Sequence, residues 1–211
     1  MNAAITKAKS LVIKFEGTVP LKADDHRFQG RLVITTDNKF RIDMTEDASS
    51  SALLVVSDGT KTTESPSKEV GKKFGPARVT SKDATKNLLS TFARSGICMP
   101  MVYANVIEEG KAGTIEEVDP SLKASDFRFG KKEKVDGKNA QAIDYKLTMS
   151  RRDDQIVFDA TVWMDVQTHL PLKRVLTIRL KVEKARPITE TYLAVSVDGK
   201  IDEKTFELPK K

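Results

Sequence analysis

The chain has 211 residues, of which 39% are hydrophobic and 31% are charged, and its formal net charge is +6. This balance is ordinary for a soluble globular protein with a sizeable hydrophobic core. The single cysteine, Cys98, excludes an internal disulfide, and no segment approaches the roughly 18 consecutive apolar residues of a membrane-spanning helix.

The basic residues are spread along the chain and are interleaved with 30 acidic residues. Dispersed charge of this kind favours a solvated basic exterior over a nucleic-acid interface, while transient contact with an anionic membrane surface stays open. Met1 leads directly into "NAAITKAKS", which lacks the apolar stretch of a signal peptide. A cytosolic protein and an exported protein given without its export segment both fit this beginning.

Three stretches in the first third of the chain alternate apolar and polar residues, which is typical of half-buried strands. They are "SLVIKFEGTV", the hairpin "HRFQGRLVITTDNKFRIDM" about Asp37-Asn38, and the strand pair "ALLVVSDGTKTTE" about Asp58-Gly59. The apolar positions of the first two stretches fall on one face: Leu11, Ile13, Phe15, Phe28, Leu32, Ile34, Phe40, Ile42 and Met44.

The apolar period changes from two to about four in "TSKDATKNLLSTFARSG". Leu88 and Phe92 lie one helical turn apart, so this segment is predicted to be an amphipathic helix. Pro100 could open a second short helix, although the run after it could also be a strand. Residues 65–79 and 110–124 are predicted to be loops.

Strand patterns return from residue 126 onward. One hairpin, "FRFGKKEKVDGKNAQAIDYKLTM", turns at Asp136-Gly137, and a second joins "IVFDATVWMD" to "LPLKRVLTIRLKV" through "VQTHL". The segment "ITETYLAVSVDGK" adds a further strand. About ten strands in hairpin order predict a mainly β protein: a strongly curved antiparallel sheet, or half-barrel, with helices covering its concave face.

No catalytic or metal-binding motif stands out. His26 follows Asp24 and Asp25, but three adjacent polar residues in a turn explain this cluster better than a metal site. His169 is predicted to be an exposed turn residue, and Cys98 to be a small core residue rather than a nucleophile. The sequence therefore predicts no metal, no cofactor and no enzymatic activity.

The aromatic residues and the predicted helical segment suggest an apolar ligand cavity, although plain core packing explains the same pattern and is favoured by periodicity alone. The candidate cavity and lid residues are Phe15, Phe28, Leu32, Ile34, Phe40, Ile42, Leu88, Leu89, Phe92, Met99, Met101, Phe127, Phe129, Phe158 and Trp163. An apolar face does not by itself reveal whether ligand or protein fills it.

Several segments in series resemble the LolA/LolB-like superfamily of outer-membrane lipoprotein carriers and receptors. They are "AKSLVIKFEGTV", "FQGRLVIT" followed by "KFRIDM", "LLVVSDGTKT", "NLLSTFARSG", "VWMDVQTHLPLKR" and "IDEKTFELP". The resemblance implies a single domain over residues 1–211, with a half-barrel, an apolar cavity that shields acyl chains in the periplasm, and a lid over about 81–107. It also implies that all three Asp-Gly pairs are hairpin turns.

The chain departs from the dedicated members of this superfamily. The arginine that ends the carrier's second strand has no counterpart here, where Thr35 and Thr36 stand, and the internal Cys98 is not a lipid-attachment cysteine. The chain therefore resembles the broad group of relatives rather than the carrier itself.

The first functional hypothesis is a non-enzymatic, periplasmic or otherwise exported, monomeric protein that binds a lipid, an acyl chain or a lipoprotein. The alternative is a structural or protein-interaction module whose core is filled by its own side chains and whose open sheet edge binds a protein strand. An enzyme is the third hypothesis, with the strand carboxylates of Asp144, Asp159 and Asp165 as candidate groups. It ranks last, because no sequence pattern pairs these carboxylates with a base or a nucleophile.

Overall fold

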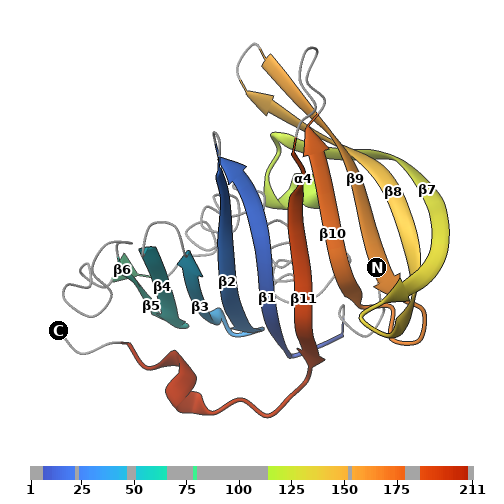
Figure 1. Ribbon diagram of the computed structural model, residues 1–211. Helices are drawn as coiled ribbons and strands as arrows, with labels where there is room; N and C mark the ends of the chain where they lie inside the picture. Colours follow the sequence, from blue (N-terminus) through green and yellow to red (C-terminus); the bar gives the residue numbers. More distant parts are fainter. Residues whose placement is uncertain are drawn as a thin grey trace.

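The described part of the chain forms one antiparallel sheet of eleven strands (Figure 1). In this computed structural model the described residues are 7–21, 24–46, 51–65, 78–79, 114–151, 154–178 and 186–208. The strand order is β6-β5-β4-β3-β2-β1-β11-β10-β9-β8-β7, so the last strand of the chain pairs with the first at the centre. The two end strands, β6 and β7, do not pair with each other, and the sheet is not closed into a barrel.

The strands are connected mostly as hairpins of successive segments, as the sequence predicts. They are β1 (Ser10–Leu21), β2 (Asp24–Thr35), β3 (Lys39–Glu46), β4 (Ser51–Asp58), β5 (Lys61–Ser65), β6 (Arg78–Val79), β7 (Leu122–Val135), β8 (Lys138–Arg151), β9 (Asp154–Asp165), β10 (Pro171–Ile178) and β11 (Ile188–Val197). Within the described residues, two short helical elements accompany these strands: α4 (Ile115–Val118) and the 3-10 turn η1 (Glu203–Phe206).

Alternation along the strands gives the sheet an apolar face, here called the inner face. Ile13 of β1 lies opposite Leu32 of β2, which in turn lies opposite Ile42 of β3. These three side chains are at most 1% exposed. The cluster continues through β8, β9 and β10 and includes Ile115 of α4, so residues from both halves of the sheet share one core.

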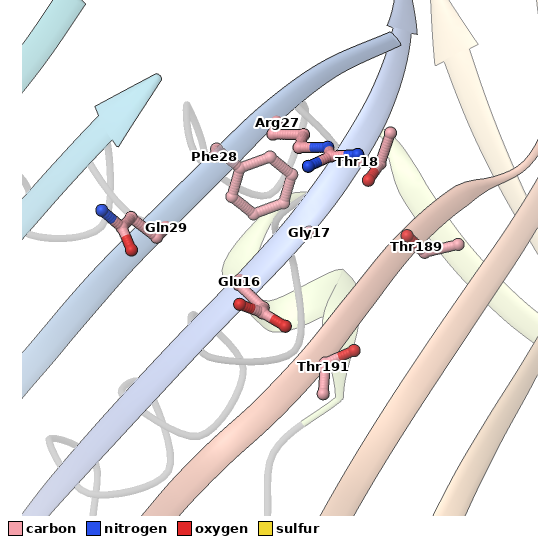
Figure 2. A pocket seen from close by; sticks show the side chains of 8 residues that line it. All are labelled: Glu16, Gly17, Thr18, Arg27, Phe28, Gln29, Thr189 and Thr191. Atoms are coloured by element: carbon pink, nitrogen blue, oxygen red, sulfur yellow. The ribbon is translucent and has the colours of Figure 1, made fainter. Parts of the chain in front are cut away.

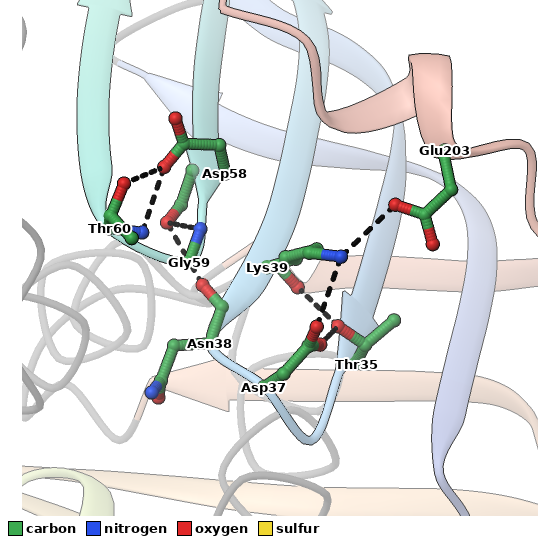
Figure 3. A network of polar contacts seen from close by, with 9 residues as sticks. Thr35, Asp37, Asn38, Lys39, Asp58, Gly59, Thr60 and Glu203 are labelled. Carbon is green, nitrogen blue, oxygen red and sulfur yellow. Dashed lines mark hydrogen bonds and ion pairs between the residues drawn. The ribbon is translucent and has the colours of Figure 1, made fainter.

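Local hydrogen bonds explain why the β2–β3 and β4–β5 connections turn where they do (Figure 3). Asp58 Oδ1 accepts hydrogen bonds from the backbone N–H groups of Thr60 at 2.8 Å and Lys61 at 2.7 Å. The following Gly59 has a φ of 93°, a left-handed conformation that glycine adopts without steric cost. Ser57 Oγ donates to the carbonyl oxygen of Asn38 at 2.9 Å, which joins the two turns.

The carboxylates in these turns are held in their charged form. Burial disfavours the charge of Asp58, but the hydrogen bonds from Lys61 and Thr60 outweigh it and lower its pKa. Burial also disfavours the charge of Asp37, but the Thr35 hydroxyl and the Lys39 ammonium outweigh it, so the pKa of Asp37 is lowered as well. Both turns are therefore best stabilised when their carboxylates are ionised.

The C-terminal residues pack on the other face of the sheet, here called the outer face. Lys39 and Arg41 alternate with inner-face residues of β3 and therefore point outward. Arg41 donates to the carbonyl oxygen of Thr205 at 3.4 Å, and Lys39 Nζ lies 3.0 Å from a carboxylate oxygen of Glu203. Phe206 is 3% exposed, so η1 is anchored across β3 and β4.

The structure corrects several predictions from the sequence. Residues 65–79 are not all loop, because β5 ends at Ser65 and β6 forms Arg78–Val79. Residues 110–124 are not all loop either, because α4 and the start of β7 lie within them. Asp198-Gly199 is not a hairpin turn: the Asp198 carboxylate accepts the backbone N–H groups of Lys9 at 2.6 Å and Ser10 at 3.2 Å. The predicted helix over 80–96, the lid over 81–107 and Cys98 lie outside the described residues.

Candidate ligand-binding face

The inner face brings together the candidate residues from four strands. Seven of the predicted cavity residues are buried in the single core cluster: Phe15, Phe28, Leu32, Ile34, Phe40, Ile42 and Phe158. They come from the consecutive strands β1, β2 and β3 and from β9, which lies more than a hundred residues further along the chain. The apolar surface that the sequence predicts is therefore continuous across the sheet.

A buried ion pair interrupts the apolar character of this face. Arg174 of β10 lies directly opposite Glu190 of β11, and a guanidinium nitrogen lies 2.9 Å from a carboxylate oxygen. Both side chains are 1% exposed. The hydroxyl of Tyr192 donates to the same carboxylate, which gives the buried charge a second partner. Pairing and hydrogen bonding together make such buried charges tolerable.

The ion pair was missed in the sequence, although a signal for it was present. In "LKRVL", Arg174 has the same strand parity as Leu176, and in "ITETY", Glu190 lies between Ile188 and Tyr192 with the same parity. Period-two alternation places each charge on the face of its apolar neighbours. Two opposite charges at apolar positions of adjacent strands predict a buried ion pair, because pairing compensates both charges for the loss of water.

Phe127 and Phe129 belong to the last strand of the sheet and are not part of the buried core. Their side chains are 62% and 84% exposed. Phe129 lies opposite Ile143, an inner-face residue of β8, and the Phe127 ring stacks on Tyr145 with centroids 5.5 Å apart. The apolar inner face therefore extends to the open edge of the sheet, where it meets water.

Trp163 lies on the outer face, away from the other candidate residues. It is opposite Ala142 and Lys173, and its indole N–H donates to the carboxylate of Glu133. Lys173 Nζ stands 5.7 Å from the ring centroid, within the range of a cation–π contact. Trp163 is therefore left out of the ligand-binding face, whereas Leu88, Leu89, Phe92, Met99 and Met101 lie outside the described residues.

The acidic and histidine candidates have structural partners. His26 Nδ1 lies 2.9 Å from a carboxylate oxygen of Glu46, rather than facing the two aspartates before it. Asp144 accepts a hydrogen bond from the Thr161 hydroxyl at 2.7 Å, and Asp165 accepts the Gln167 N–H at 2.8 Å. Among the residues that the structure describes, no group of three or more His, Cys, Asp or Glu could hold a metal ion.

An open pocket of about 410 Å³ is bordered by residues of β1, β2 and β11 (Figure 2). Its lining consists of Glu16, Gly17, Thr18, Arg27, Phe28, Gln29, Thr189 and Thr191. Apart from Gly17 and Phe28, these residues alternate with the buried residues of their strands, so their side chains belong to the outer face. Their hydroxyl, amide and charged groups make this pocket unlike the apolar inner face.

No protein-family model matches the chain, and no curated protein matches it in sequence. Solved structures do match. One is MucB, at 12% identity and a TM-score of 0.47, with 98% of this chain and 60% of MucB covered. Another is LprF from Mycobacterium bovis, at 8% identity and a TM-score of 0.49, with 94% of this chain and 90% of LprF covered.

A third match is the LolA superfamily protein NE2245 from Nitrosomonas europaea, at 11% identity and a TM-score of 0.39, with 98% and 96% of the two chains covered. The chain spans about 60% of the length of MucB. Within the described residues, no helix is both long enough and apolar enough to cross a membrane.

Proposed function

We propose that this protein is a non-enzymatic binding protein, and that its ligand is a lipid, an acyl chain or a lipoprotein held against the inner face. The observation that carries the proposal is the continuity of the apolar inner face. It runs from β4 through β8 in one cluster and reaches the unclosed edge of the sheet at Phe129. A face that is apolar apart from the buried pair of Arg174 and Glu190, and that is open at one edge, suits a long apolar ligand.

The physical basis of binding would be the removal of apolar surface from water. Each square ångström of apolar surface that a ligand buries contributes about 25 cal/mol. The inner face supplies few polar groups, since the charges of Arg174 and Glu190 are buried and paired with each other. A site of mostly apolar lining with a few placed polar groups is typical of lipid-like ligands.

We further propose that the whole of residues 1–211 is one domain, with the lid over 81–107, and that the protein works outside the cytoplasm. These parts of the proposal rest on the resemblance in sequence. In this proposal the lid covers the inner face and moves to admit the ligand. The protein-interaction module with a self-filled core is the alternative that the first experiment separates.

Native mass spectrometry of the protein as purified, compared with a denatured and solvent-extracted sample, tests the proposal. A bound mass of lipid size is the expected result, and after its removal a fluorescent fatty acid should bind. A ligand-free mass together with no binding of the fatty acid would overturn the proposal and favour the self-filled module.

A pair of variants localises the binding. Ile143→Trp adds bulk on the inner face, where Ile143 is half-buried between Val162 and Phe129, and should weaken fatty-acid binding. Val157→Trp is the matched control, because Val157 is also half-buried but lies on the outer face of β9. Equal loss of binding in both variants would contradict an inner-face site.

A further inference from the structure

The C-terminal part of β7, residues 127–134, is here called the rim. It combines exposed aromatic rings with exposed cations. Phe129 is 84% exposed and Phe127 is 62% exposed. Lys131, Lys132 and Lys134 follow them, and all three are exposed. Large apolar side chains in water are ordinary when they are scattered, but two beside a run of lysines form a combined apolar and basic surface.

The register of β7 with β8 determines on which face of the sheet each charged residue of the rim lies. Lys132 lies opposite Gln141, and Lys134 lies opposite Asn139. Gln141 and Asn139 have the same parity as Ile143, so the two lysines share the inner-face side with Phe129. Glu133 lies opposite Ala140 and is bound to Trp163 on the outer face. The inner-face side of the rim is therefore aromatic and positively charged, without an acid among its described strand residues.

Protection of a sheet edge explains only part of this arrangement. Charged residues and bulges on an edge strand block the addition of another strand. The rim has both, because its register with β8 shifts between Ser125 and Arg128 and again between Phe129 and Lys132. A peptide strand is thus a poor partner for this edge. The two exposed phenylalanines, however, do nothing to block strand addition and need another explanation.

We propose that the rim is a docking surface for an anionic lipid bilayer. Phe127 and Phe129 enter the boundary between headgroups and acyl chains, while Lys132 and Lys134 contact the lipid phosphates. Apolar rings beside cations are the combination that binds interfacially, since the rings lose water contact and the cations gain anionic neighbours. This docking goes beyond ligand binding, because it requires no ligand on the inner face.

Sedimentation of the full chain with lipid vesicles tests the proposal. Vesicles of phosphatidylcholine with phosphatidylglycerol should bind the protein, and vesicles of phosphatidylcholine alone should bind it much more weakly. Raising the salt concentration should weaken binding, because the screening length falls from about 10 Å at 0.1 M to about 3 Å at 1 M. Equal binding to both vesicle types, or no binding to either, overturns the proposal.

Matched variants assign the binding to the rim. Phe129→Ser should weaken vesicle binding on the order of tenfold or more, because its ring is the most exposed of the large apolar side chains described. Leu193→Ser is the control, since Leu193 is 58% exposed on β11. Lys132→Glu with Lys134→Glu should weaken binding by at least about tenfold, whereas Lys14→Glu with Lys200→Glu changes the net charge equally and should have less effect.

The outcomes separate this proposal from the proposed function. Loss of vesicle binding in Phe129→Ser with unchanged fatty-acid binding supports docking by the rim. Loss of fatty-acid binding with unchanged vesicle binding overturns docking and makes the rim part of the ligand site. A protein that binds anionic vesicles through the rim but never binds a fatty acid supports docking and contradicts the proposed function alone.

Discussion

The ring of Phe15 on β1 lies over Gly30 on β2, so that a Cβ atom added to Gly30 would stand 2.6 Å from Cζ of that ring. The reverse arrangement lies next to it, where the Phe28 ring of β2 covers Gly17 of β1. The two ring centroids are 6.3 Å apart, and the ring planes are inclined by 59°. Each glycine is thus required by the aromatic ring of the facing strand, which uses the space of a missing side chain.

Gly30→Ala should destabilise the protein by about 1–3 kcal/mol, the usual cost of forcing extra atoms into a packed core. The added methyl group would meet both the Phe15 ring and, at 2.9 Å, the carbonyl oxygen of Asp43, which cannot move aside. Urea unfolding measures the change. Gly199→Ala is the control, because its nearest neighbour is the hydroxyl of a flexible serine side chain, and it should have little effect. Equal destabilisation would contradict the packing argument.

The buried pair of Arg174 and Glu190 should be costly to break. Glu190→Ala is expected to lower the free energy of unfolding by about 3–5 kcal/mol, because it leaves a buried guanidinium without its carboxylate. Asp25→Ala is the matched control, since Asp25 pairs with Arg186 at the same 2.9 Å distance, but the two side chains are 56% and 39% exposed. That exposed pair should contribute at most about 1 kcal/mol.

A double variant separates the net contribution of the ion pair to stability from the cost of leaving one of its charges unpaired. Arg174→Met with Glu190→Leu replaces both charges by apolar groups of similar size and should recover most of the stability that Glu190→Ala loses. Chemical denaturation of the single and double variants provides the comparison. A double variant that is less stable than Glu190→Ala would show that the ion pair itself stabilises the fold. The loss in Glu190→Ala would then not come only from leaving one buried charge unpaired.

The attachment of the C-terminal residues should depend on Phe206 rather than on the surface ion pair beside it. Phe206→Ala is expected to cost about 3–5 kcal/mol, because it removes a 3% exposed ring from the outer face. Glu203→Ala removes only the contact with Lys39 and should cost at most about 1 kcal/mol. Thermal unfolding of both variants tests the order, and a larger effect of Glu203→Ala would refute it.

The strands and two of the turns could be predicted because their causes are local. Period-two alternation identifies the strands, and an Asp-Gly pair between two such runs identifies Gly59 and Gly137, both with positive φ. Asp198-Gly199 has the same letters but no strand after it, and its carboxylate holds the start of β1 instead. This role of Asp198 depends on the pairing of β1 with β11, two strands far apart in sequence, so local sequence could not predict it.

The candidate face was predicted less well where it depends on strand order. Phe158 and Trp163 are five positions apart on β9, an odd separation, so alternation alone already puts them on opposite faces. Phe129 has inner-face parity, but its exposure follows from β7 being the last strand of the sheet. Sequence gives the face of a residue through local geometry, whereas its depth depends on which strands lie beside it.

The turn after β9 should make stability depend on pH through Asp165. The backbone N–H of Gln167, together with that of Thr168, lowers the pKa of Asp165 below its ordinary value of 3.8 against the opposing effect of burial. A carboxyl group whose pKa is lowered by folding stabilises the protein above its unfolded pKa and loses that contribution as the pH falls through the folded pKa. Asp165→Asn should therefore be less stable than the wild type at neutral pH, and the difference should shrink below about pH 4. Urea unfolding across this range measures it, with the exposed Asp154→Asn as control; a difference that stays constant with pH would mean that the charge of Asp165 plays no part.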